Sequence, residues 1–210
     1  MKNSQKIVIK LGSSLLTNKR GGVNKAVLKN VVKDIVWLLS SKKEVVVVSS
    51  GAISLGRGKL NLKHDLTLNE SQAVAARGQI ELMTAWKNEF KKYKKQVAQI
   101  LLSPSDIKNK KSSKNAMTTL ENLLNFNCVP IINENDTTST DEIKFGDNDI
   151  LAAQIAVLIN ADHLVLLSNV DGLYKKPPKN NKNDDLVLEV KSITKKVKDM
   201  AGAASKLGKG

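Results

Sequence analysis

The sequence predicts an α/β fold with helices on both faces of a mostly parallel β-sheet. Three observations carry this prediction. Short β-rich segments alternate with longer segments of helical pattern. Apolar runs such as Val45–Val48 are typical of strands buried on both faces. Three such runs end in small or polar residues, and ligands bind beyond the carboxyl ends of strands in open α/β sheets.

The alternation sets the order of the elements along the chain. We expect strands at 6–11, 44–49, 96–102, 129–133, 163–168 and 186–190, and helices at 24–41, 69–93, 112–126, 148–159 and 193–200. In the first of these helices, apolar residues recur every three or four positions from Val27 to Leu39. Residues 141–144 are expected in a hairpin, another helix is expected to open at 50–52, and the proline-containing segment 175–184 is expected to be an exposed loop.

Composition indicates one soluble domain spanning residues 1–210. A chain of 210 residues that is 41% hydrophobic can bury one core. It has no apolar run near the roughly 20 residues that cross a bilayer and no signal peptide, so we expect a cytoplasmic protein without a membrane partner. Cys128 is expected to be a small buried hydrophobe. With only His64 and His163 beside it, no zinc site is predicted.

The net charge of +14 raises the possibility of nucleic-acid binding. The basic residues are nearly all lysine, however, and they are scattered over predicted helix faces. Aromatic residues make up only 3% of the chain, whereas single-strand binders stack bases on aromatic platforms. We therefore interpret the lysines as solvated surface and do not expect a nucleic-acid partner.

Lys10 is the first candidate site residue, because it lies within the apolar run Ile7–Leu11. An ammonium group at the end of a strand can neutralise phosphate oxygens during phosphoryl transfer. Gly12, two residues later, lets the backbone approach a phosphate closely. The alternative is a lysine on an edge strand whose charged end reaches solvent.

Ser50, Gly51 and Ala52 are the second candidate group. They open a helix, so their backbone N–H groups and the helix dipole suit an anion. The alternative is an ordinary serine cap before a glycine turn. The nearby segment 51–57 has the glycine spacing of a P-loop, but arginine replaces the lysine, so we exclude that motif.

Two polar clusters follow further along the chain. Asp136, with Asn133 and Asn135, offers oxygens suited to an ammonium ion, or alternatively forms local turn bonds. Asp149 can hold two lysine ammonium groups while Asn148 contacts a ligand, although both can also cap the helix that follows.

The last candidate segment is the loop after strand 163–168, which begins at Ser168 and Asn169 and can receive a nucleotide. The two histidines, His64 and His163, are expected to be surface or packing residues, because neither has an obvious carboxylate partner nearby in sequence.

Together these motifs resemble the glutamate 5-kinases of the amino acid kinase family, in order and spacing across the whole chain. The segments that carry the resemblance are Val8–Ser13, Val47–Ile53, Pro130–Asp136, Phe145–Asp149 and Asp171–Tyr174. The resemblance implies a three-layer αβα sandwich. It also implies transfer of the ATP γ-phosphoryl group to the side-chain carboxylate of L-glutamate, the first step of proline synthesis, with Mg²⁺ carried on the nucleotide and with self-association into a homo-oligomer.

The resemblance also implies roles for individual residues. Lys10 matches the ATP-contacting lysine, near Gly12 and Ser13, and Asp149 matches the aspartate that organises the catalytic lysines. Three side chains match glutamate ligands: Ser50, Asp136 and Asn148. Two residues match the backbone donors beside the reacting carboxylate: Gly51 and Ala52. Two more lie where the family commonly has Thr-Asp contacts to the nucleotide: Ser168 and Asn169.

The chain departs from the family pattern at its end. Lys209 and Gly210 precede the place where the family has a second glycine-rich segment with another catalytic lysine, the last elements of the kinase domain and often an RNA-modification-type domain. If the 210 residues are the whole protein, we expect phosphoryl transfer to fall by about three orders of magnitude or more without that lysine. The alternative is that they are an amino acid kinase domain truncated before this segment. The alternative function is therefore a catalytically impaired protein or regulatory homologue that binds glutamate or proline.

Overall fold

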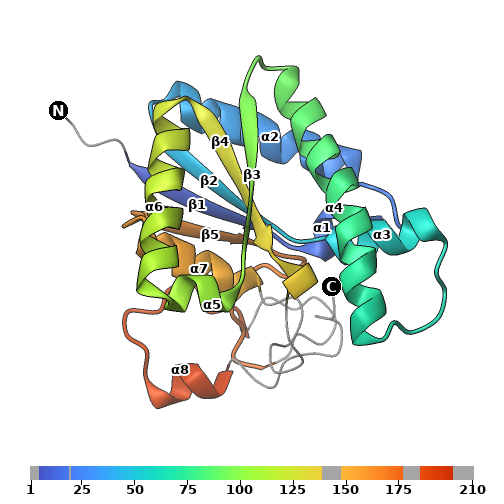
Figure 1. Cartoon of the computed structure of the whole chain (residues 1–210). Coiled ribbons are helices and arrows are strands. Elements are labelled where there is room, and N and C mark those ends of the chain that lie inside the picture. The colour runs from blue at the N-terminus through green and yellow to red at the C-terminus, as the bar shows by residue number, and fades with distance from the viewer. Residues whose placement is uncertain (1–4, 19, 139–147, 177–184, 201–210) are drawn as a thin grey trace.

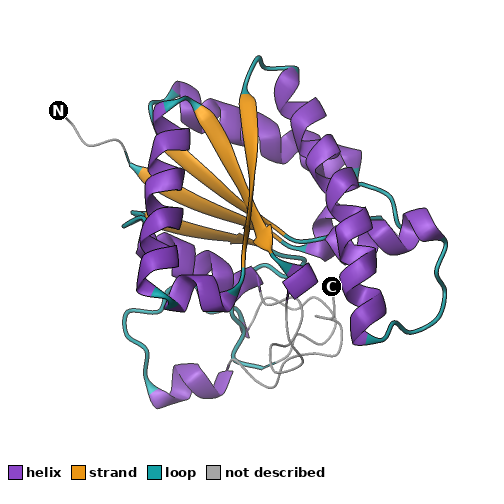
Figure 2. Cartoon of the chain, viewed as in Figure 1, coloured by secondary structure: helices purple, strands orange, loops and turns teal. Residues whose placement is uncertain are grey.

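The computed structural model describes residues 5–18, 20–138, 148–176 and 185–200. These residues form one parallel five-stranded sheet in the order β3-β4-β2-β1-β5 (Figure 2). The strands are β1 (Lys6–Leu11), β2 (Glu44–Ser49), β3 (Gln96–Leu102), β4 (Cys128–Glu134) and β5 (His163–Leu167). The predicted α/β class is confirmed, and β1 lies in the interior of the sheet between β2 and β5.

Helices cover both faces of the sheet and complete an αβα sandwich of three layers (Figure 1). The longer helices are α2 (Lys25–Ser40), α3 (Ala52–Leu60), α4 (Leu68–Lys91), α6 (Lys110–Asn125) and α7 (Asn148–Leu158). The shorter ones are α1 (Ser13–Leu16), α5 (Pro104–Lys108), α8 (Lys195–Met200) and the 3₁₀ turn η1 (Asp136–Thr138).

Alternation along the central strands divides the core in two. In β2, Val45 and Val47 pack with α2 and α4, whereas Val46 and Val48 pack with α6 and α7. Successive side chains of a strand point to opposite faces, so a central strand has to be apolar at every position. This requirement explains the uninterrupted valine run in the sequence.

The first core contains a buried aromatic pair on α4. The rings of Trp86 and Phe90 are stacked with centroids 5.9 Å apart. The indole Nε1 of Trp86 donates a hydrogen bond of 2.9 Å to Ser49 Oγ at the end of β2. The bond satisfies a buried donor and fixes α4 against the strand that leads into the candidate site.

Helices α3 and α4 pack at close range because glycines line their contact. A Cβ atom on Gly78 would lie 1.7 Å from the carbonyl oxygen of Ala52, and one on Gly56 would lie 2.0 Å from that of Val74. No larger residue fits at either position without moving a helix. The middle of α4 therefore touches the first turn of α3.

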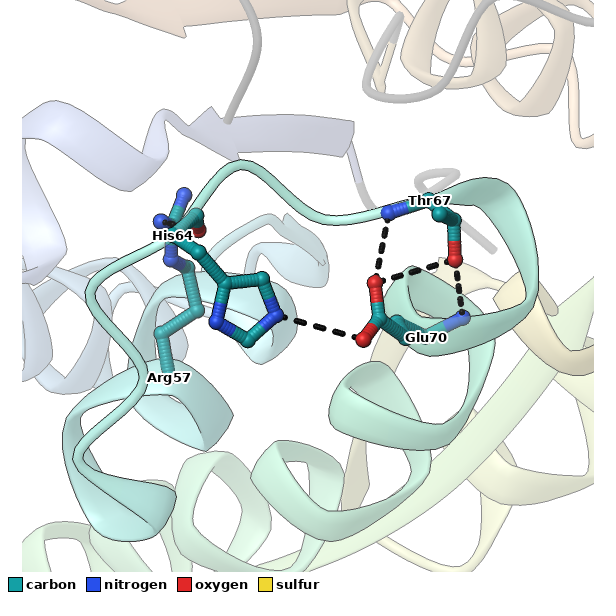
Figure 3. A network of polar contacts seen from close by, with 4 residues as sticks. All are labelled: Arg57, His64, Thr67 and Glu70. Carbon is teal, nitrogen blue, oxygen red and sulfur yellow. Dashed lines mark hydrogen bonds and ion pairs between the residues drawn. The ribbon is translucent and has the colours of Figure 1, made fainter.

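The start of α4 is held by the polar network of Figure 3. Thr67 and Glu70 form a reciprocal capping box, in which the Thr67 backbone N–H donates to the carboxylate at 2.8 Å. His64 Nε2 lies 3.2 Å from Glu70 Oε1, and Arg57 donates to the His64 carbonyl at 2.6 Å. The Thr67 backbone and hydroxyl bonds, followed by His64, lower the pKa of Glu70. His64 is a surface residue as predicted, but it does have a carboxylate partner nearby in sequence.

Several predicted elements differ from the structure. Residues 186–190 do not form a strand, because their pairing is limited to one isolated bridge between Leu186 and Tyr174. The last predicted helix is shorter, at Lys195–Met200. Cys128 is partly rather than fully buried, and that burial raises the pKa of its thiol. The predicted hairpin at 141–144 lies outside the described residues.

Candidate active site

Four neighbouring strands bring the candidate residues to one edge of the sheet. β4, β2, β1 and β5 are adjacent and parallel, so their carboxyl ends lie side by side. The start of α7 crosses this edge and contacts residues from three of these strands or the loops directly after them. Residues far apart in the sequence thereby share one site.

Lys10 and Asp149 form an ion pair within this site. Lys10 Nζ lies 2.5 Å from Asp149 Oδ1, with the lysine side chain 12% and the aspartate 55% exposed. A Cβ placed on Gly12 would lie 3.6 Å from Nζ, so the ammonium group lies over that glycine. Because β1 is an interior strand, the alternative of an edge-strand lysine is wrong. Lys10 shares a sheet face with Val8, which is the face that α7 covers.

The loop after β2 brings a helix start beside Lys10. Gly51 has φ +114°, which favours glycine, and it is the N-cap residue of α3 without a side-chain cap. The alternative of a serine cap at Ser50 is therefore wrong. A Cβ on Gly51 would lie within 4.0 Å of the Cα of Ser13, so the loops after β1 and β2 are in contact. The first N–H groups of α3, from Ala52 on, have no intrahelical acceptor and suit an anion.

A buried relay of amide side chains links three elements to Ser50. Asn148 Nδ2 donates to Ser50 Oγ at 2.7 Å and to Asn133 Oδ1 at 3.0 Å. Asn133 Nδ2 in turn donates to Gln79 Oε1 of α4 at 2.9 Å. Asn148 is 3% exposed, and within the described ranges its fully buried Oδ1 has no hydrogen-bond partner. Such an atom is costly unless a ligand donates to it.

Gln79 was not among the candidates predicted from the sequence. It lies in the middle of a long amphipathic helix and, along the sequence, far from the end of every strand. No local motif distinguishes it from any other polar helix residue. Its relation to the site depends on packing of α4 against β4, which the sequence pattern does not specify.

Asp136 begins the 3₁₀ turn that follows β4, the strand that carries the relay residue Asn133. Burial, and then the negative charge of Glu134, raises the pKa of Asp136 to about 7. A nearby cation would stabilise the charged form of a carboxyl group whose pKa is raised in this way. The local alternative holds for Asn135, whose Oδ1 accepts from Thr137 Oγ1 at 2.6 Å. It does not hold for Asn133, which makes bonds across the fold.

The predicted nucleotide residues lie along the adjoining ends of β1 and β5. Gly12 N donates to the Leu167 carbonyl at 3.3 Å, and Ser13 begins α1. Ser168 and Asn169 follow β5 directly and are exposed, with Ser168 Oγ 3.3 Å from Asn169 Oδ1. Ser168 and Asn169 therefore lie on the side of Lys10 opposite the loop after β2, because β5 pairs with β1 on that side.

Within the described part of the chain, no group of three or more His, Cys, Asp or Glu residues could hold a metal ion. None of the helices in that same part is both long and apolar enough to span a bilayer.

The chain has relatives among known proteins. The model of the amino acid kinase family matches residues 5–209. The chain is 46% identical to the glutamate 5-kinase of Pelagibacter ubique strain HTCC1062 over 202 residues, which are 96% of this chain and 55% of that protein. It is 46% identical to the glutamate 5-kinase of Brucella anthropi over 212 residues, which cover 100% of this chain and 56% of that protein. The chain thus corresponds to little more than half the length of these relatives.

Solved structures share the fold at low sequence identity. The UMP kinase from Bacillus anthracis superposes with a TM-score of 0.57 at 19% identity, covering 84% of this chain and 70% of that one. The UMP kinase from Ureaplasma parvum gives a TM-score of 0.57 at 20% identity, covering 82% and 73%. These two matches concern the fold alone. With a family model that matches nearly its whole length, this chain belongs to the amino acid kinase family.

Proposed function

We propose that this chain forms the substrate-binding core of a glutamate 5-kinase, which transfers the ATP γ-phosphoryl group to the side-chain carboxylate of L-glutamate and so opens proline synthesis. The observation that carries the proposal is the ion pair of Lys10 and Asp149 beside the relay of Ser50, Asn148 and Asn133. The names of the relatives at 46% identity support the choice of glutamate.

The relay and Asp136 suit the amino-acid part of the substrate. An α-ammonium group can donate to the unpartnered Asn148 Oδ1 and to the Asp136 carboxylate. The reacting carboxylate would then meet the Ser50 hydroxyl and the backbone N–H groups at Gly51 and Ala52. Glutamate would satisfy both the orphaned acceptor and the destabilised carboxylate.

Lys10 and its neighbours suit the nucleotide. The side-chain carboxylate of glutamate is ionised at neutral pH, since its ordinary pKa is about 4.3, so it needs no general base to attack the γ-phosphorus. The bond from the γ-phosphorus to the β,γ-bridging oxygen breaks, ADP leaves, and the products are ADP and an acyl phosphate. Lys10, oriented by Asp149, neutralises charge on the transferred group. Gly12, Ser13, Ser168 and Asn169 border the space for ATP.

In this proposal Mg²⁺ binds to the phosphates of the nucleotide. The described residues hold no cluster of three carboxylate, His or Cys ligands, whereas Mg²⁺ commonly binds substrate phosphates and keeps several waters. The ion would lower the negative charge of the phosphates.

The proposal is tested by glutamate titration calorimetry and by an ATP- and glutamate-dependent assay that traps the acyl phosphate with hydroxylamine. We expect saturable binding of L-glutamate, much weaker binding of D-glutamate, and hydroxamate formation that requires both substrates. Lys10→Met should abolish the hydroxamate while leaving glutamate binding intact. The proposal would be overturned if L-glutamate showed no binding and no turnover. Binding without turnover would support the impaired homologue instead.

A further inference from the structure

Two consecutive residues in the middle of α4 contact residues of the proposed glutamate subsite and of the relay that leads to it. Gly78 allows the helix to approach the Ala52 carbonyl at the first turn of α3. Gln79, the next residue, accepts a hydrogen bond from Asn133 at the start of the relay. Gln79 makes no direct bond to Ser50 or Asn148, so any influence on the ligand has to pass through Asn133.

The relay has a direction, with the Gln79 oxygen as the acceptor at its α4 end. An amide side chain has a donor end and an acceptor end, and turning it by half a rotation exchanges them. Because Gln79 presents its oxygen, Asn133 turns its nitrogen toward α4 and its oxygen toward Asn148. That oxygen engages the Asn148 nitrogen, which also donates to Ser50 Oγ.

The consequence appears at the far end of the relay. With its nitrogen used twice, Asn148 is left with Oδ1 as its free atom, and this oxygen is buried without a partner among the described residues. A free oxygen suits a ligand that donates, such as an ammonium group, whereas a free nitrogen would repel it. The three amide orientations are therefore coupled, with the Gln79 oxygen at the α4 end of the relay.

We propose that Gln79 is a positioning residue that orients Asn133 and Asn148 so that Asn148 presents an acceptor to the substrate ammonium group. The inference rests on the proposed function, because it assigns a glutamate contact to Asn148. Gln79 acts through its neighbours and does not itself contact the substrate.

The decisive test compares substitutions that keep, remove or invert the acceptor at position 79. Gln79→Glu keeps an oxygen toward Asn133, Gln79→Met has similar length without an acceptor, and Gln79→Lys offers only donors. Gln99→Met makes the same chemical change at an exposed position of β3 and is the matched control. For each protein, L-glutamate affinity and ATP affinity are measured by calorimetry, together with the midpoint of thermal unfolding.

We expect Gln79→Met and Gln79→Lys to weaken L-glutamate binding about 10- to 100-fold, the scale of leaving a buried polar group unpaired. ATP affinity should stay within about twofold in both, since the hydrogen bond of Gln79 is to Asn133 and not to Lys10 or the residues beside it. Gln79→Glu should remain within about threefold of the unchanged chain for both ligands, and Gln99→Met should match it. If Gln79→Met fails to fold, glutamate affinity can still be measured in Gln79→Lys, because the charged end of a lysine can reach solvent from this half-buried position.

Three results would overturn the inference. Wild-type glutamate affinity in Gln79→Lys would show that the orientation does not depend on this acceptor. Equal losses of glutamate and ATP affinity would indicate a purely structural role, as would equal losses in the Glu and Met variants. Glutamate binding by the unchanged chain separates these outcomes from failure of the proposed function, because its absence removes both proposals.

Discussion

Replacing Asp136 by asparagine should stabilise the protein at neutral pH and lower its affinity for L-glutamate. Burial and the neighbouring Glu134 raise the pKa of Asp136 to about 7, from an ordinary value of 3.8. The folded state therefore holds the Asp136 proton over a pH range in which the unfolded chain releases it. Asparagine has nearly the same shape and carries no charge, so it removes this difference.

The sign and size follow from linkage. Between pH 4 and 7 the folded state binds more protons than the unfolded state, so the free energy of unfolding falls as the pH rises and stays low above 7. One pKa unit corresponds to about 1.4 kcal/mol, which sets an upper limit of about 4 kcal/mol for this carboxyl. Because Asp136 keeps some solvent contact and asparagine also has to be desolvated, we expect a gain of about 1–2 kcal/mol at pH 8 and almost none at pH 4.

Urea unfolding at pH 4, 6 and 8 measures this difference, with Asp65→Asn as a control that makes the same charge change at an exposed position. Calorimetry at pH 8 on the same proteins should show L-glutamate binding about tenfold or more weaker in Asp136→Asn, because a charge-assisted bond to the ammonium group is lost. A stability gain that is equal at pH 4 and pH 8 would refute the reasoning, as would a gain that Asp65→Asn reproduces.

Three further predictions concern other parts of the same edge of the sheet. Gly51→Ala should destabilise the fold by about 1–2 kcal/mol, because φ +114° strains any Cβ, and it should weaken glutamate binding, both measurable by urea unfolding and calorimetry. Asp149→Asn leaves the largely buried Lys10 ammonium without its partner, so we expect a loss of about 1–3 kcal/mol in stability together with loss of turnover, while Lys10→Met should lose turnover with less cost in stability. Trp86→Phe removes the donor to Ser49 Oγ and leaves space in the core, so the free energy of unfolding should fall by about 1–3 kcal/mol, and an unchanged midpoint would contradict that account.

The fold was largely predictable because its signals are local and repeated. The valine run of β2 alternates between two helical layers, and only a strand covered on both faces requires that composition. The prediction was wrong where a segment with strand-like composition has no neighbouring strand to pair with. Residues 186–190 have the composition of a strand, but a strand forms only when a neighbour completes its hydrogen bonds, and Leu186 has a single bridge.

The candidate site was predictable in part for a related reason. Lys10, Ser50 and Asp136 lie at or just beyond the end of a strand, and a parallel sheet necessarily gathers such positions at one edge. Asn148 instead begins helix α7. Which of them touch was not predictable, because distances depend on how α7 crosses that edge. The ion pair and the bond from Asn148 to Ser50 join residues about a hundred or more positions apart.

The same reasoning explains why the orientation of the relay escaped the sequence. Composition tells which side chains can hydrogen-bond, but an amide is equally able to give or accept, so Asn148 alone carries no preference for a cationic or an anionic guest. In the structure that preference goes with the orientation of Gln79 on α4, whose oxygen accepts from Asn133. Specificity for an ammonium group is thus a property of three packed elements, and it should change when the acceptor on α4 is inverted, even though every residue at the strand ends is unchanged.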